Sequence, residues 1–108
     1  MATNNSIHII GNMGKDPEMA FKGQDADVPV TKVSVAVQRK RDKDADPDWF
    51  NVVAFYGTAE YLNQYGEKGR KVAIEGEMRQ NRWETEDGQP RSTYELVAQD
   101  VQFLDYRE

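Results

Sequence analysis

The stretch Asp-Trp-Phe-Asn-Val-Val-Ala-Phe-Tyr, residues 48–56, decides the fold of this 108-residue chain. It is rich in aromatic and β-branched residues and contains neither Gly nor Pro, which is typical of a β-strand. Successive side chains of a strand point to opposite faces. The two faces are Trp49, Asn51, Val53 and Phe55, and Phe50, Val52, Ala54 and Tyr56. Both carry apolar bulk, so the second face either stacks on flat rings such as nucleobases or is covered by core or a neighbouring subunit.

Four further strands are predicted around this one. Val30–Arg39 alternates, with Val33, Val35 and Val37 facing inward. Arg70–Trp83 is the longest, and Gly76 inside it predicts a bulge or sharp bend. The first strand is Ile7–Ile10, and the last runs from about Arg91 to Leu104.

The connections contain turn and helix signals. Gly11–Gly14 predicts a turn, which leads to a short extended piece at Met19–Phe21. Thr58 can cap a short helix over Ala59–Tyr65. In that helix Leu62 and Tyr65 form a small apolar stripe, enough to close one end of a sheet. Asp87-Gly88 is a strong hairpin signal.

Five strands with one short helix between the third and fourth is the element order of the OB-fold, an all-β, five-stranded Greek-key barrel. We therefore expect residues 1–108 to form a single OB-fold domain. Such barrels bind oligonucleotides or sugars on the face of strands 2 and 3 and on loops 1–2 and 4–5. Trp49 and Phe55 fall on the third strand, and Trp83 begins loop 4–5. This placement favours a binding role for the three rings over burial.

The charge distribution is mixed. The formal net charge of −5 argues against a nucleic-acid-binding protein, which usually carries a basic footprint. From Lys32 to Arg82, however, ten Lys and Arg face eight Asp and Glu, while the remainder holds four against eleven. A polyanion senses the local field, so the middle of the chain is still able to bind phosphate.

Several classes of site are not expected. The chain has no cysteine, which excludes disulfides and thiolate chemistry, and His8 is its single histidine. Asp42, Asp44 and Asp46 alternate like calcium ligands, but no loop Gly or distal Glu completes an EF-hand pattern. We expect no metal, no cofactor and no enzymatic activity. Neither a signal peptide nor a membrane span is predicted, so cytoplasmic residence is expected.

A series of ordered motifs carries a family resemblance over nearly the whole chain. They are Gly-Asn-x-Gly-x-Asp-Pro-Glu at 11–18, the aromatic strand 48–53, Ile74-Glu75-Gly76, Arg79-x-x-x-Trp83 and the ending 101–104. With these motifs the chain resembles bacterial-type single-stranded DNA-binding proteins. The resemblance implies sequence-tolerant binding and protection of single-stranded DNA during replication, recombination or repair. It also implies residence at the nucleoid of a bacterial or phage-infected cell.

The resemblance also implies site residues. Trp49, Phe55 and Trp83 match the rings that stack on bases. By position, the phosphate contacts that the resemblance implies are Lys43, Lys68, Arg79 and Arg82, followed by Arg41 and Arg91. Independently of the resemblance, the charged run after the second strand indicates an arm that reaches a phosphate backbone with Arg39, Lys40, Arg41 and Lys43; its alternative role is a solvated loop with its opposite charges paired. Because Lys40 stands where many members carry another aromatic, a larger ionic share of the affinity is expected.

Members of this family usually form homotetramers, so a homotetramer or a dimer is expected, often with strand 1 at the contact. The sequence ends at Glu108 without the Gly/Pro-rich, acidic-tipped tail of typical members, and recruitment of partners through such a tail is not expected. The alternative is a primosomal replication-restart paralogue, which has the same barrel and acts mainly by contacting other proteins.

Overall fold

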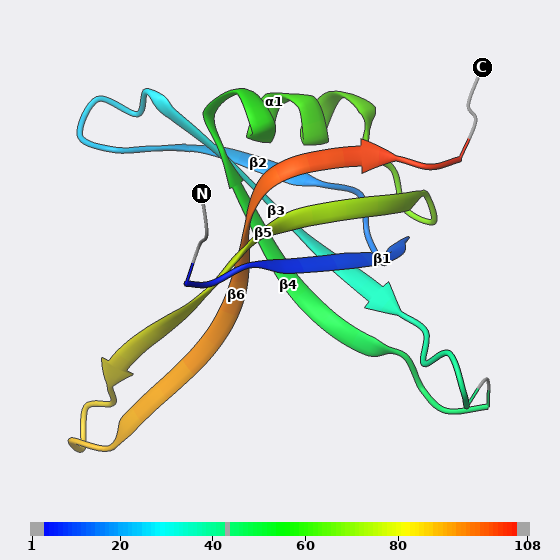
Figure 1. Cartoon of the computed structure of the whole chain (residues 1–108). Coiled ribbons are helices and arrows are strands. Elements are labelled where there is room, and N and C mark those ends of the chain that lie inside the picture. The colour runs from blue at the N-terminus through cyan, green and yellow to red at the C-terminus, as the bar shows by residue number, and fades with distance from the viewer. Residues whose placement is uncertain (1–3, 43, 106–108) are drawn as a thin grey trace.

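A single sheet curls into a barrel that one helix covers at its end (Figure 1). The computed structural model describes residues 4–42 and 44–105. The elements are β1 (Ile7–Met13), β2 (Glu18–Lys22), β3 (Val28–Val37), β4 (Asp48–Phe55), α1 (Tyr56–Tyr65), β5 (Lys71–Glu84) and β6 (Pro90–Phe103). No described helix is long and apolar enough to cross a membrane.

The sheet closes on itself through its first strand. The order is β1-β5-β6-β4-β3-β2, and β1 also pairs with β3 at Asn12↔Ala36 and Met13↔Val35. The β4–β6 pair is parallel and short, at Val52↔Leu96 and Val53↔Val97. All other pairs are antiparallel. The predicted OB-fold is confirmed, with β2 added as a sixth strand along the edge of β3.

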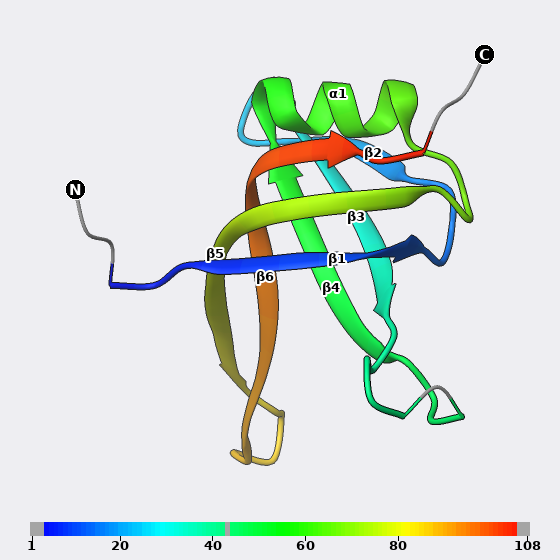
Figure 2. The same cartoon turned by 45° about the vertical axis from the view of Figure 1, so that its right-hand side comes forward.

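Two arms extend from the barrel (Figure 2). One is the β5–β6 hairpin, which is paired from Val72↔Phe103 out to Glu84↔Pro90. Its register shifts between Glu75 and Gly76, which confirms the predicted bulge. The predicted hairpin turn is also confirmed, since Gly88 has φ +82° and donates its N–H to Thr85. The other arm is the connection between β3 and β4.

The core lies inside the barrel and beneath α1. Val33 and Val35 of β3 point inward as predicted, and Val52 and Ala54 of β4 join them. Leu62 of α1 is fully buried and closes the end of the barrel, as expected. Tyr65 does not belong to that apolar stripe; it is 48% exposed and lies beside Tyr61 on the surface.

Two boundary predictions are wrong. The turn predicted at Gly11–Gly14 is instead strand through Met13, because Gly11 lets β1 cross β3 closely: a Cβ there would lie 2.2 Å from the Ala36 carbonyl oxygen. The helix starts at Tyr56, not Ala59, and no side chain caps it, so Thr58 lies inside it. Tyr56 makes the change of direction with φ +54°, a backbone region that sequence patterns rarely assign to tyrosine.

Candidate nucleic-acid interface

The outer face of β4 carries two exposed rings. Trp49 and Phe55 lie six residues apart on the strand, so both project from the same face. Trp49 is 59% exposed and Phe55 is 37% exposed. Between them Val53 is buried in a small second cluster with Val30 and Val97, which gives this outer face an apolar base.

The strand register brings Trp83 onto this same face. Val53 of β4 lies beside Val97 of β6, and Val97 pairs with Glu77 of β5. Laterally paired residues share a face, and the β5–β6 register is unbroken from Glu77 out to Trp83↔Arg91. Trp83, 47% exposed, therefore belongs to the face that carries Trp49 and Phe55. We call this surface, defined by Trp49, Phe55 and Trp83, the platform face.

A glycine positions the Trp49 indole. A Cβ built on Gly14 would lie 2.5 Å and 2.8 Å from two atoms of the Trp49 ring. Gly14 is anchored by its N–H, which donates to the Ser34 carbonyl at 2.8 Å. The indole therefore lies against a backbone that has no side chain, with more than half of its surface left to solvent.

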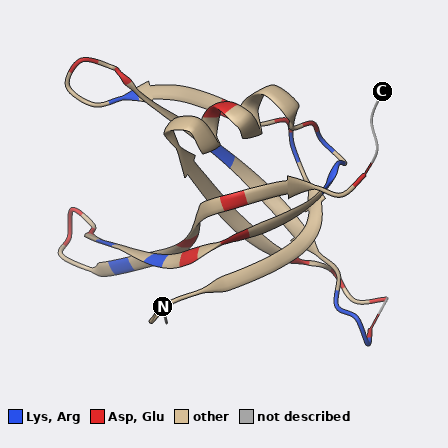
Figure 3. Cartoon of the chain, turned by 45° about the horizontal axis from the view of Figure 1, so that its top comes forward, with Lys and Arg blue, Asp and Glu red and all other residues tan. Residues whose placement is uncertain are grey.

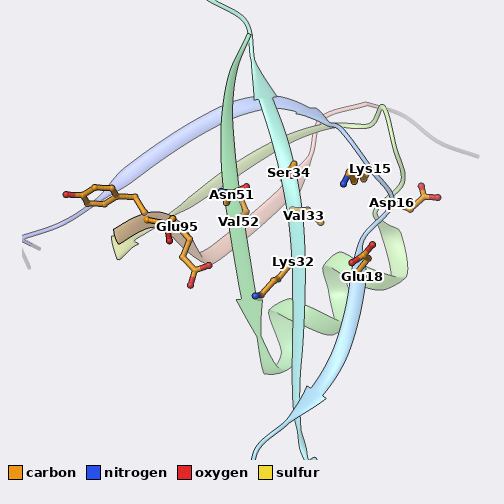
Figure 4. Close-up of a pocket in the computed structure, with 11 residues that line it drawn as sticks. Lys15, Asp16, Glu18, Lys32, Val33, Ser34, Asn51, Val52 and Glu95 are labelled. Carbon is orange, nitrogen blue, oxygen red and sulfur yellow. The ribbon is translucent and has the colours of Figure 1, made fainter. Parts of the chain in front are cut away.

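A polar cleft of about 270 Å³ opens on the platform face (Figure 4). Its centre is formed by Ser34 of β3 and Asn51 of β4, with Val33 and Val52 also lining it. Glu95 of β6 lies on one flank, and Asp16 and Glu18 lie on the other. The remaining lining residues are Lys15, Lys32, Thr93 and Tyr94.

The arginines of the β5–β6 arm divide between its two faces. Arg79 and Arg91 share the platform face with Trp83, although the Arg79 guanidinium bonds the Glu77 carboxylate at 2.8 Å. Arg82 pairs with Ser92 and projects from the opposite face. The structure therefore brings two of these three predicted cations to the rings.

Lys68 lies near the cleft. Its backbone N–H donates to the Asp16 carboxylate at 2.8 Å, which ties the loop between α1 and β5 to the β1–β2 connection. The Lys68 side chain is exposed.

The β3–β4 arm begins with an ion pair beside the platform face. Arg39 donates two hydrogen bonds, of 3.1 Å and 3.2 Å, to the carboxylate of Asp48, the neighbour of Trp49. These hydrogen bonds lower the pKa of Asp48; desolvation partly opposes this change and Coulomb attraction adds to it. The same contacts raise the pKa of Arg39. Lys40 and Arg41 are exposed, and Lys43 lies outside the described residues.

Charges of both signs alternate along the two arms (Figure 3). The surface is therefore not a continuous basic stripe, and its distinctive feature is the set of exposed rings. Among residues 4–42 and 44–105, no three His, Asp or Glu side chains converge in a way that could hold a metal ion.

Comparisons with known proteins identify the family of this chain. A model of the Single-strand binding protein family matches residues 4–104. The chain belongs to this family.

Two similar proteins are named single-stranded DNA-binding proteins. One, from Thermotoga maritima, is 41% identical over 106 residues, which cover 94% of this chain and 74% of that protein. The other, "Single-stranded DNA-binding protein 1" of Xylella fastidiosa, is 36% identical over 110 residues, 96% of this chain and 79% of its own length.

Sequence reasoning missed part of this candidate interface. Ser34 and Glu95 line the cleft but belong to separate strands, and only the register brings them beside Asn51. Gly14 had a signal, its place in the Gly-Asn-x-Gly motif, but its contact with Trp49 required the fold. Lys32 also had a sequence signal, weaker than that of Gly14: its outward position in an alternating strand.

Proposed function

We propose that this chain binds and protects single-stranded DNA, without catalysis and with little dependence on base sequence. The observation that carries the proposal is the presence of three exposed rings, Trp49, Phe55 and Trp83, on one continuous sheet face. Each ring can stack on any base, because every base has a π-face, and this contributes about 1–3 kcal/mol per base.

Stacking also explains selectivity for single strands. A base presents its free faces only when it has left the duplex stack, so the platform face gains nothing from paired DNA. Arg91 and Lys68 supply exposed cations for the phosphates, and each neutralised phosphate releases counterions. No bond is made or broken in this process.

The family membership supports this function over a module that acts mainly by contacting other proteins, since the similar proteins above carry the name of the DNA-binding activity. We further propose that the chain works as a homo-oligomer in replication, recombination or repair. The side of β1 that faces away from β5 pairs with β3 only at Asn12 and Met13, which leaves backbone groups of Ile7–Ile10 available to another strand.

The function is tested by tryptophan fluorescence titration with oligo-dT and with duplex DNA of equal length. We expect stoichiometric quenching by oligo-dT and weak binding of duplex. Trp49→Ala and Trp83→Ala should each weaken binding by about 1–3 kcal/mol. In these variants binding is followed by fluorescence anisotropy of labelled DNA.

Tyr65→Ala is the matched control, because Tyr65 is an exposed aromatic on α1 and not on the platform face. It should leave the affinity unchanged. Equal affinity for duplex and single strand would remove the proposed mechanism.

A further inference from the structure

Three side chains of the polar cleft have no partner among the described residues. Asn51 and Ser34 at its centre and Glu95 on its flank make no side-chain hydrogen bond or ion pair within residues 4–42 and 44–105. Glu95 is also half-buried. Arg79 lies opposite Glu95 in the register, but its guanidinium bonds Glu77 instead. A partly desolvated carboxylate gains from a hydrogen-bond donor, so the cleft can accept a ligand that brings one.

The charges of the cleft decide which part of a DNA strand can enter. Three carboxylates, Asp16, Glu18 and Glu95, outnumber two ammonium groups, Lys15 and Lys32. Carboxylates flank the cleft on both sides (Figure 4). A phosphate would be repelled by this surrounding, whereas the edge of a base is neutral. A bound DNA strand would therefore turn its bases toward the cleft and its phosphates away from the carboxylates, toward Lys15 and Lys32.

The acceptors of the cleft also discriminate among bases. A carboxylate only accepts hydrogen bonds, and the exocyclic amino group of cytosine is a donor that Glu and Asp accept from in DNA complexes. Thymine presents a carbonyl oxygen at the equivalent position, which would face the Glu95 carboxylate unfavourably. The volume of about 270 Å³ is below the range of drug-sized pockets and suits a pyrimidine better than a larger ligand.

We infer that the cleft between Asn51 and Glu95 receives a base edge and favours cytosine over thymine, with Glu95 as the specificity-determining residue. This inference rests on the proposed function, because it concerns the same platform face. It predicts a modest preference for cytosine within otherwise sequence-tolerant binding.

The test compares the affinities of oligo-dC and oligo-dT of equal length for the full chain and for Glu95→Gln. Homopolymers place the same base at the cleft in every register. The ratio of the two affinities cancels the general gain from removing one negative charge. In Glu95→Gln we expect the oligo-dC to oligo-dT affinity ratio to fall by at least about fivefold.

Glu86→Gln is the matched control, because it makes the same charge change in the connection between β5 and β6, away from the cleft. It should leave the ratio at the wild-type value. A second measurement needs no variant: an oligonucleotide of pyrimidin-2-one, which is cytosine without its amino group, should bind the wild-type chain more weakly than oligo-dC by a similar factor.

An unchanged ratio in Glu95→Gln, with both oligonucleotides bound tightly, overturns this inference alone. Equal wild-type affinity for oligo-dC and the pyrimidin-2-one oligomer does the same. If neither homopolymer binds the wild-type chain, the proposed function fails and the inference fails with it.

Discussion

At the scale of single residues, Gly14 sets the position of the Trp49 ring, because the ring lies where a side chain of residue 14 would be. A methyl group there would meet the indole at 2.5 Å, and the indole, being more than half exposed, can move away. We therefore expect Gly14→Ala to fold and to weaken binding of oligo-dT by up to the loss caused by Trp49→Ala, about 1–3 kcal/mol.

A double-mutant cycle checks this mechanism. If Gly14 acts only through the ring, Gly14→Ala should cost nothing further in the Trp49→Ala background. Additive losses of binding free energy would show instead that Gly14 contributes separately, for example by close approach of its backbone to the strand.

The Arg39–Asp48 pair holds a cation beside Trp49 in a contact that competes with phosphate. Asp48→Asn should free Arg39 and steepen the log–log salt slope for oligo-dT by about 0.7, the value of one additional phosphate contact. Asp46→Asn, which removes an equal charge from an exposed residue of the same arm, should raise affinity slightly and leave the slope unchanged.

The sign of the pH effect follows from the lowered pKa of Asp48. A carboxylate whose folded pKa is lowered contributes stability above its unfolded value, here near 3.8, and loses it only as the pH falls through the lower folded pKa. The pair is therefore intact from about pH 7 to about pH 5. The difference in salt slope between wild type and Asp48→Asn should therefore be the same at pH 7 and at pH 5. A difference that disappears by pH 5 would show that the Arg39–Asp48 pair is already lost there.

At the scale of elements, the bulge in β5 depends on a missing side chain. A Cβ on Gly76 would lie 1.9 Å from the Val97 carbonyl oxygen, and neither backbone can move without breaking the ladder. Gly76→Ala should lower the free energy of unfolding by about 1–3 kcal/mol. Gly57→Ala is the matched control, because nothing lies within 4 Å of its Cβ position and the residue is helical.

Gly57→Ala should raise the free energy of unfolding, by at most about 1 kcal/mol, because alanine favours a helix more than glycine does. Urea unfolding of both variants at one protein concentration measures the two effects, and the fixed concentration removes any contribution from assembly. Equal effects of the two substitutions would show that Gly76 is not sterically required.

Elements with strong periodicity could be predicted from sequence, and elements shaped by tertiary contact could not. The alternating valines of β3 and the Asp87-Gly88 turn are local signals, and the structure confirms both. The end of β1 depends on how closely it crosses β3 at Gly11, and the start of α1 depends on the backbone of Tyr56. Neither is encoded in the pattern of neighbouring residues.

At the scale of the whole molecule, the rings could be predicted and the cleft could not. Trp49 and Phe55 are six residues apart on one strand, so period two alone places them together. The cleft collects residues from β2, β3, β4, β6 and the β1–β2 connection. The sheet order β6-β4-β3-β2 places them side by side, and no spacing in the sequence reports that β4 pairs with β6.

The whole-molecule charge of −5 makes the salt response the strictest test of how this chain holds DNA. Four exposed cations without a described ion pair lie at the cleft or on the platform side of the β5–β6 arm: Lys15, Lys32, Lys68 and Arg91. If all four contact phosphate, the log–log salt slope for single strands should be about −3, with stacking supplying the rest of the affinity.

Arg91→Ala should make this slope shallower by about 0.7, whereas Arg82→Ala, an equal charge change on the opposite face of the same arm, should leave it unchanged. Titrations across a salt series measure both, and an equal loss of slope in the two variants would show that DNA contacts both faces of the β5–β6 arm.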